Sequence, residues 1–186
     1  GFTIRNGLGD LGGAVRIDNA GTLENCRVTS SRASNDGGGV LCSWGGIVRN
    51  CWIVGNVSGD DGGGVACKDG GEVINCIVRN NRAADKGGGV YLSGGAVFGS
   101  LIVDNESTSY DDGGGGVYTK EGGTVGNCTI VANLASGANG EGGGIWFGDL
   151  ASVVNSIIYF NTGSQQATRN LGGNVQGVSF SCTVPD

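Results

Sequence analysis

Residues 37–56 read GGGVLCSWGGIVRNCWIVGN, and residues 62–81 read GGGVACKDGGEVINCIVRNN. Each stretch opens on a glycine triplet followed by Val and closes on hydrophobic residues followed by a polar residue. Similar opening blocks begin at positions 12, 87, 114 and 142, and the blocks at 12, 37, 62 and 87 are evenly spaced. Self-similarity at a fixed period indicates a repeat architecture built from one supersecondary unit. The sequence therefore predicts a stack of similar coils.

Length varies in only one part of the repeat. The stretch from the first glycine of a block to the polar residue that ends the unit has the same length in five units. It is a single residue shorter in the remaining unit, which runs from Gly87 to Asn105. The remaining segment has five residues in the early units (7–11, 32–36, 57–61 and 82–86) but eight in 106–113 and 134–141. This division predicts a rigid part and one loop corner that absorbs insertions.

The rigid part carries strand and turn signals. Val, Ile, Thr and aromatic residues form short runs bounded by Gly and Asn. We predict an all-β fold, a single-stranded right-handed parallel β-helix of about seven coils of ~25 residues, with about three short strands per coil. The right hand follows from the rule for parallel crossovers. Four inward apolar columns are expected, running from Val15 to Ile145, Ile17 to Phe147, Leu23 to Val153 and Val28 to Ile158.

Asparagine and glycine recur at fixed places between these columns. Asn25, Asn50, Asn75 and Asn127 precede Cys at equivalent positions, where Asn tolerates left-handed backbone angles. A second polar column, from Asn6 to Asn161, is expected to form a ladder of side-chain hydrogen bonds. The glycine triplets indicate positive φ or a close approach of backbone.

Composition and charge exclude several classes of protein. The net charge of −6 argues against a nucleic-acid partner, and no apolar run is long enough to span a bilayer. Histidine, the commonest general base, is absent. We expect residues 1–186 to form a single domain cut from a longer chain, because the sequence starts inside a repeat. Residues 171–186 are expected to form a terminal, less regular coil or cap.

Several phrases resemble right-handed parallel β-helix repeat proteins of bacterial surfaces: GFTIRNG at 1–7, NCIVRN at 75–80, GGGVY at 87–91, NSIIYFNTG at 155–163 and SCTVPD at 181–186. They look most like choice-of-anchor Q domain proteins. They are also similar to the GGA[ILV] and F-x-x-N repeats of chlamydial polymorphic outer-membrane proteins. The resemblance implies a large secreted or cell-surface protein with a separate C-terminal anchoring region. It brings no catalytic motif to these positions.

An acidic row lies just before the glycine blocks and includes Asp10, Asp36, Asp85 and Glu141. Stacked carboxylates repel one another unless they are solvated or bridged by a cation. One interpretation is a solvated loop row that deters edge-on association. The other is calcium binding through carboxylate and carbonyl oxygens, at Asp60 with Asp61 and at Asp111 with Asp112.

Tyr91, Tyr118 and Trp146 occupy equivalent outward positions in consecutive units. On a flat face they could stack on sugar rings or pack under another chain. Alternatively they are strand formers covered by neighbouring loops. A second outward apolar row consists of Trp52, Ile77, Leu101 and Ile157.

The seven cysteines match no zinc-binding spacing. Cys26, Cys51 and Cys76 share one column, and Cys42 shares another with Cys67. The favoured interpretation is a set of small core hydrophobes. A Cys42–Cys67 bridge is the most plausible disulfide, since that column offers only one pairing.

No set of residues forms a catalytic or cofactor-binding constellation by sequence position. The carboxylates of the rigid part, such as Asp18, Glu24 and Asp149, fall in different columns. We therefore expect a structural or adhesive extracellular module, used for surface attachment or for filament or surface-layer assembly. Its partner would be another copy of the chain, a surface protein or a glycan. The alternative is a carbohydrate-binding or polysaccharide-degrading β-helix module.

Overall fold

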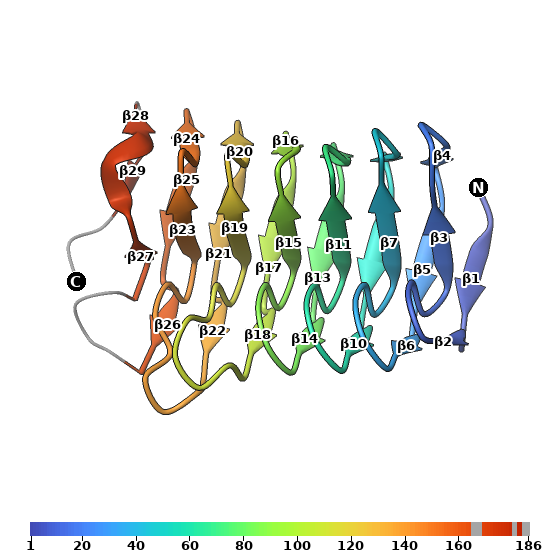
Figure 1. Ribbon diagram of the computed structural model, residues 1–186, viewed down its shortest axis with the longest axis horizontal. Coiled ribbons are helices and arrows are strands. Elements are labelled where there is room, and N and C mark those ends of the chain that lie inside the picture. Colours follow the sequence, from blue (N-terminus) through green and yellow to red (C-terminus); the bar gives the residue numbers. More distant parts are fainter. Residues whose placement is uncertain (165–168, 180–181, 184–186) are drawn as a thin grey trace.

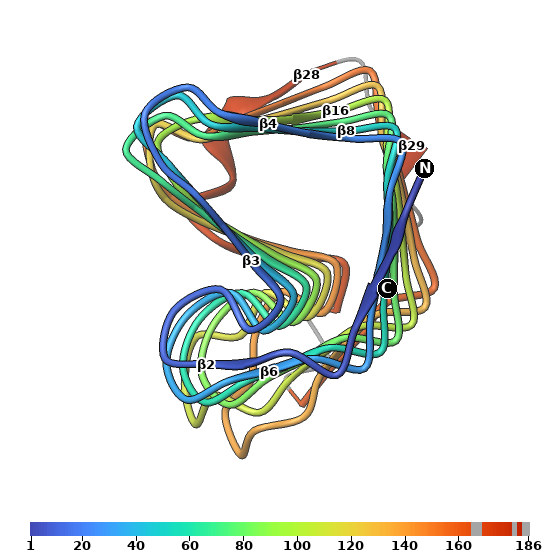
Figure 2. The same ribbon diagram turned by 90° about the vertical axis from the view of Figure 1, so that its right-hand side faces the viewer.

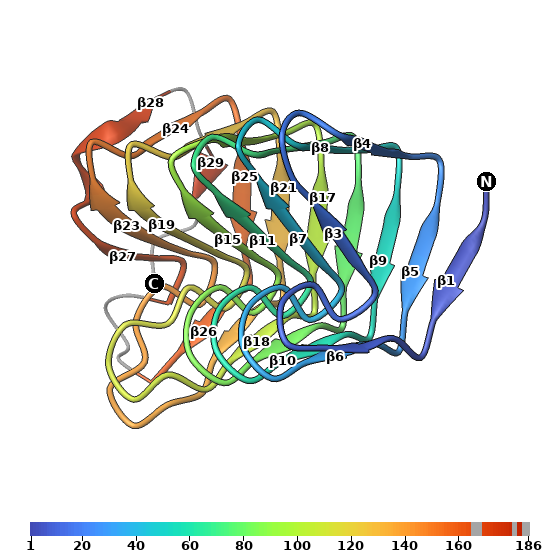
Figure 3. The ribbon, with the colours of Figure 1, turned by 45° about the vertical axis from the view of Figure 1, so that its right-hand side comes forward.

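The computed structural model describes residues 1–164, 169–179 and 182–183 and consists of four parallel sheets stacked into a β-solenoid of about seven coils (Figure 1). Successive strands of each sheet come from successive coils and point the same way (Figure 3). Among the described residues, no helix has the length and apolar character required to cross a membrane.

The four sheets, A to D, are each built from one strand per coil. Sheet A comprises β1 (Thr3–Arg5), β5 (Arg27–Thr29), β9 (Trp52–Val54), β13 (Ile77–Arg79), β17 (Leu101–Val103), β21 (Thr129–Val131), β25 (Ile157–Tyr159) and β29 (Cys182–Thr183). Sheet B comprises β2 (Leu8–Gly9), β6 (Arg32–Ala33), β10 (Val57–Ser58), β14 (Arg82–Ala83), β18 (Glu106–Ser107), β22 (Leu134–Ala135) and β26 (Thr162–Gly163).

Sheet C comprises β3 (Val15–Ile17), β7 (Val40–Ser43), β11 (Val65–Lys68), β15 (Val90–Ser93), β19 (Val117–Glu121), β23 (Ile145–Asp149) and β27 (Leu171–Gly173). Sheet D comprises β4 (Thr22–Glu24), β8 (Ile47–Arg49), β12 (Glu72–Ile74), β16 (Ala96–Phe98), β20 (Thr124–Gly126), β24 (Ser152–Val154) and β28 (Val178–Ser179). A 3-10 turn, η2 (Val175–Gly177), precedes β28.

Seen from the N-terminal end, the chain runs clockwise as it recedes, so the solenoid is right-handed (Figure 2). The prediction of about three strands per coil is wrong, because sheet B supplies a fourth. Its two-residue strands lie within the segment that the sequence marked as a loop. After the sheet B strands β2, β6, β10, β14, β18 and β22 the chain folds back in a hook before it enters sheet C (Figure 2).

All four predicted core columns are confirmed by the strand register. Val40, Val65 and Val90 are direct partners on neighbouring strands, as are Ile53 and Val78. The apolar interior members of these columns are fully buried and belong to one hydrophobic cluster, and the polar Thr119 of the second column is buried as well. Each apolar side chain therefore packs on its equivalents one coil above and one coil below.

The glycine triplet 87–89 shows why glycine recurs in these blocks, although the first block has Ala14 at its third position. Gly87 has φ of 69°, in the left-handed region that favours glycine. A Cβ on Gly88 would lie 2.4 Å from the Glu106 carbonyl oxygen of the next coil. A Cβ on Gly89 would lie 2.6 Å from the Gly116 oxygen and 3.0 Å from Asn105 Nδ2. Positive φ and close approach are therefore both required.

The predicted asparagine ladder forms in the second polar column. Asn105 Nδ2 donates to Asn133 Oδ1 at 2.9 Å and to the Val78 carbonyl at 3.0 Å. The backbone and side-chain nitrogens of Asn81 both donate to Asn105 Oδ1 at 3.0 Å. The pattern repeats along the buried polar column, whose further asparagines are Asn56, Asn161 and Asn170.

The first coil departs from the expected ladder by one residue. Because Ile4 pairs with Val28, Asn6 aligns with Ser30, and Gly7 aligns with Ser31. Asn6 takes the left-handed conformation with φ of 57°, and the Gly7 nitrogen donates to Ser31 Oγ at 3.1 Å. The ladder therefore starts at Ser31 and not at Asn6.

The other asparagine column acts mainly through its backbone. Asn25, Asn50, Asn75, Asn127 and Asn155 all have φ between 49° and 55°, as predicted for a tight corner. Of these side chains, the structure records one stacked amide bond, from Asn155 Nδ2 to Asn127 Oδ1 at 2.6 Å.

Candidate functional sites

The acidic row lies in the hooks between sheets B and C. One carboxylate oxygen from each of Asp60, Asp61 and Asp85 lies within 4.8 Å of the other two, a separation suited to a shared cation. Asp111 and Asp112 form no such group of three among the described residues. Asp111 instead accepts from Asn139 Nδ2 at 3.2 Å, and Asp112 pairs with Glu141 as a parallel bridge. The geometry therefore favours the first predicted calcium position over the second.

Two lysines neutralise part of this acidic row. Lys68 Nζ lies 2.6 Å from a carboxylate oxygen of the buried Asp36, and Lys86 Nζ lies 3.1 Å from Asp85. Asp61 has no lysine ion pair of its own in the described structure. Burial, followed by the charge of Asp60, raises the pKa of Asp61 to about 7.

The aromatic row packs against the same hooks. Tyr91 and Tyr118 stack with ring centroids 5.6 Å apart, and Tyr118 and Trp146 stack at 4.5 Å. Lys68 Nζ lies 6.0 Å from the Tyr91 ring centroid and Lys86 Nζ lies 5.7 Å from that of Tyr118. The acidic and aromatic rows, separate in the sequence, thus form one composite region.

The prediction that the aromatic row is an open outer face is wrong for Tyr91 and Tyr118, each of which is only 5% exposed. They form a second apolar cluster with Leu41 and Ala66 on the outer side of sheet C. The hook covers this cluster, so the alternative interpretation of covered strand formers applies to both tyrosines. Trp146, at the end of the row, remains partly exposed.

A cavity of 420 Å³ lies beside Trp146, lined also by Lys120, Asn174 and two carboxylates. These carboxylates belong to Glu121 and Asp149, which are exposed, direct partners on β19 and β23. This pair was not predicted from the sequence. The signal was present, because each residue follows its core Val or Ile by four positions.

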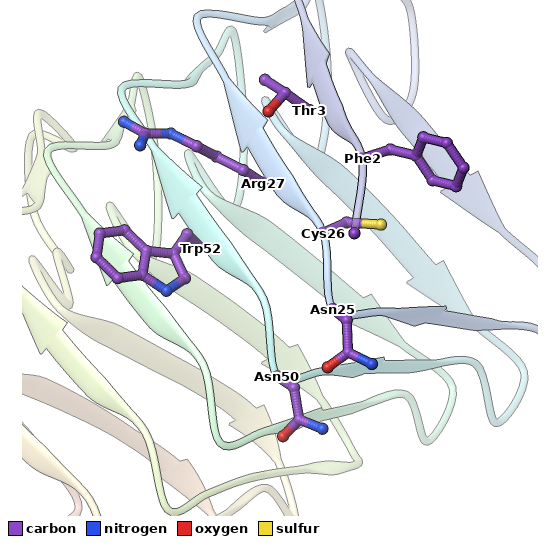
Figure 4. A pocket seen from close by; sticks show the side chains of 8 residues that line it. Phe2, Thr3, Asn25, Cys26, Arg27, Asn50 and Trp52 are labelled. Atoms are coloured by element: carbon purple, nitrogen blue, oxygen red, sulfur yellow. The ribbon is translucent and has the colours of Figure 1, made fainter.

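The outer face of sheet A carries the second apolar row. Trp52 is 48% exposed and Ile157 is 51% exposed, whereas Ile77 and Leu101 are half-buried. The register adds Thr129 to this row. At its N-terminal end, Trp52 lies 5.8 Å from the Arg27 guanidinium carbon, and both line a cavity of 460 Å³ (Figure 4).

The cysteines whose side chains are described are free thiols, and they stack in the predicted columns. Cys42 and Cys67 are direct partners on β7 and β11 and are fully buried. Both are free thiols, and Cys42 Sγ donates to the Gly46 carbonyl at 2.8 Å, so the Cys42–Cys67 disulfide stays a prediction. Cys26 is partly exposed, and Cys51 and Cys76 lie in the core. Cys182 has a placed backbone, but its side chain lies outside the described residues.

Comparison with known proteins gives no match to a family model, a curated protein or a solved structure.

Proposed function

We propose that this chain is a structural or adhesive module outside the cell. In this role a rigid solenoid presents one flat face for surface attachment or for lateral assembly into filaments or a surface layer. The observation that carries the proposal is the outer face of sheet A, where an apolar row runs from Trp52 to Ile157. The resemblance to choice-of-anchor Q domain proteins and to chlamydial polymorphic outer-membrane proteins supports a secreted or surface location.

The size of this face favours weak contacts repeated many times. The five strands from β9 to β25, about 4.8 Å apart and about 10 Å long, present roughly 240 Å². A stable pairwise interface buries about 800 Å² on each partner. A single face-to-face contact is therefore weak. The favoured partner is another copy of the chain, because it offers the same apolar strip and many such weak contacts can build an array.

Sedimentation velocity over a range of concentrations tests this proposal, together with negative-stain electron microscopy. The wild-type chain is expected to self-associate as concentration rises. The double variant Trp52→Thr, Ile157→Thr is expected to stay monomeric. Threonine fits this row, because Thr129 already occupies it. Leu150→Asn, which removes an exposed apolar side chain away from sheet A, serves as the matched control. Equal association of both variants would contradict the role of this face.

A carbohydrate-binding or polysaccharide-degrading role is the second candidate, and the cavity beside Trp146 favours it. Aromatic surface next to paired carboxylates suits the apolar faces and hydroxyl groups of a sugar. Strand partners about 4.8 Å apart also place Glu121 and Asp149 near the separation of about 5–5.5 Å used by retaining glycosidases.

A glycan array and a reducing-sugar assay test this second role. Trp146→Ala and Glu121→Gln should each abolish binding or release. Glu24→Gln, which changes a carboxylate paired with Arg49 on a different sheet, should leave both unchanged. A blank array with the wild-type chain would exclude the sugar-binding role.

A further inference from the structure

Three thiols lie in one straight column parallel to the solenoid axis. Cys26, Cys51 and Cys76 immediately precede β5, β9 and β13, whose residues pair in register. Each Sγ donates to the carbonyl two residues earlier, at 3.2, 3.1 and 3.2 Å respectively. Because the three side chains share one conformation, adjacent sulfurs are separated by the coil rise of about 4.8 Å.

This spacing is wide for a disulfide. In-register side chains also place their Cβ atoms about 4.8 Å apart, whereas a disulfide needs about 3.5–4.5 Å and an S–S bond of about 2.05 Å. A zinc–thiolate bond is about 2.3 Å long, and a linear sulfur–metal–sulfur unit with bonds of similar length spans about 4.6 Å. The column matches the span of the metal bridge without movement of the backbone.

Backbone N–H groups donate to two of the three sulfurs. The backbone N–H of Cys26 donates to Cys51 Sγ at 3.4 Å, and that of Cys51 donates to Cys76 Sγ at 3.4 Å. Hydrogen bonds to a thiolate favour its charged form. The contact with the Cys76 thiol lowers the pKa of Cys51 to about 7, whereas the same contact and burial raise the pKa of Cys76. Cys26 is partly exposed and lines the cavity shown in Figure 4, which gives an ion a path to the column.

We propose that the column of Cys26, Cys51 and Cys76 binds a soft monovalent metal ion, of the Cu(I) or Ag(I) class, in linear coordination between adjacent sulfurs. Soft thiolate ligands select such ions over calcium or magnesium. Binding replaces two thiol protons: two RSH and M⁺ give RS–M–SR⁻ and two H⁺. The metal joins neighbouring coils, so it stabilises the stack. This site goes beyond the structural role proposed above and does not depend on it.

The chain supplies a matched control for the test. Cys128 is a buried thiol in the same column, but its neighbours there are Ser100 and Ser156. Cys51→Ser leaves Cys26 and Cys76 two coils apart, so no adjacent thiol pair remains in the column. Cys128→Ser removes one thiol and breaks no pair. Ser100 Oγ donates to the Phe98 carbonyl as the cysteines do to theirs, so serine already fits this column.

The experiment is an anaerobic Ag(I) titration of reduced protein in chloride-free buffer, followed by native mass spectrometry and thermal melting. Wild type and Cys128→Ser should bind the same number of tight ions and melt at higher temperature with Ag(I). Cys51→Ser should lose at least one tight ion and the part of the melting shift that this ion supplies. The remaining cysteines are constant in this comparison. Equal losses in the two variants would overturn the proposal, as would a Cys26–Cys51 or Cys51–Cys76 disulfide forming in place of metal uptake.

Discussion

Replacing one rung of the buried asparagine ladder tests the principle that holds the coils together. Asn105→Ala removes Oδ1, which accepts from both the backbone nitrogen and Nδ2 of Asn81. It also removes Nδ2, which donates to the Val78 carbonyl and to Asn133 Oδ1. Asn105 is 1% exposed, so water does not replace these partners without entering the core.

The expected loss follows from the groups left behind. A buried polar group without its partner costs about 1–3 kcal/mol, and the Asn81 N–H and the Val78 oxygen are the two most affected. With the volume vacated by the amide added, Asn105→Ala should lower the free energy of unfolding by about 3–5 kcal/mol. Asn105→Ser should lower the free energy of unfolding by less. A serine hydroxyl can both accept and donate a hydrogen bond in this column, as Ser31 does with the Gly7 N–H and the Thr29 carbonyl.

Urea denaturation followed by circular dichroism measures the effect, with Asn127→Ala as the control. Asn127 is also a stacked asparagine, but it is exposed and stabilises mainly a left-handed corner with φ of 53°. Its replacement should cost about 1 kcal/mol. If Asn105→Ala were no more harmful than Asn127→Ala, the ladder would not be a major source of cohesion between coils.

Four further predictions concern two glycines and the acidic hook. Gly89→Ala should destabilise the fold by more than about 1 kcal/mol in the same urea assay, since its Cβ meets the next coil. Gly55→Asn should be neutral within about 0.5 kcal/mol, because Asn80 holds the equivalent left-handed position. Asp61 has a pKa of about 7 in the folded protein, above its ordinary value of 3.8. Between pH 3.8 and about pH 7 the folded protein therefore keeps the Asp61 proton, whereas the unfolded chain has lost it. Stability from this group therefore falls as pH rises from about 4 to about 7, and Asp61→Asn should gain about 1–2 kcal/mol over wild type at pH 8 after allowance for solvent screening. Millimolar calcium should raise the melting temperature at pH 8 more than at pH 5 if Asp60, Asp61 and Asp85 share a cation, and no shift at either pH would remove the calcium prediction.

The core of the solenoid was predictable because the interior is narrow and repetitive. The even spacing of the glycine blocks predicts that Val40, Val65 and Val90 stack, and the strand register confirms this stacking. Sheet B was not predictable in this way. Its strands have two residues each, such as Arg82–Ala83, and so few residues carry no alternation that could distinguish strand from loop.

The burial of the aromatic row depended on a contact that repeat alignment does not reveal. Alignment places Tyr91 and Tyr118 on the outer side of sheet C, which is correct, but exposure is decided by the hook that precedes each strand. The pair formed by Glu121 and Asp149 differs, because equal offsets within their repeats would have revealed it.

The hooks contribute to a second core on the outer side of sheet C. Leu41 and Ala66 fill the outer row in early coils, and Tyr91, Tyr118 and Trp146 fill it in later ones. Leu11, which lies in the first hook, packs against this second cluster. The segment 106–113 is three residues longer than 82–86, yet Tyr91 and Tyr118 are each 5% exposed, so the extra residues are not required to cover a tyrosine ring. The variable corner is therefore part of a second core and not a free display loop, and lateral partners are better sought on sheet A.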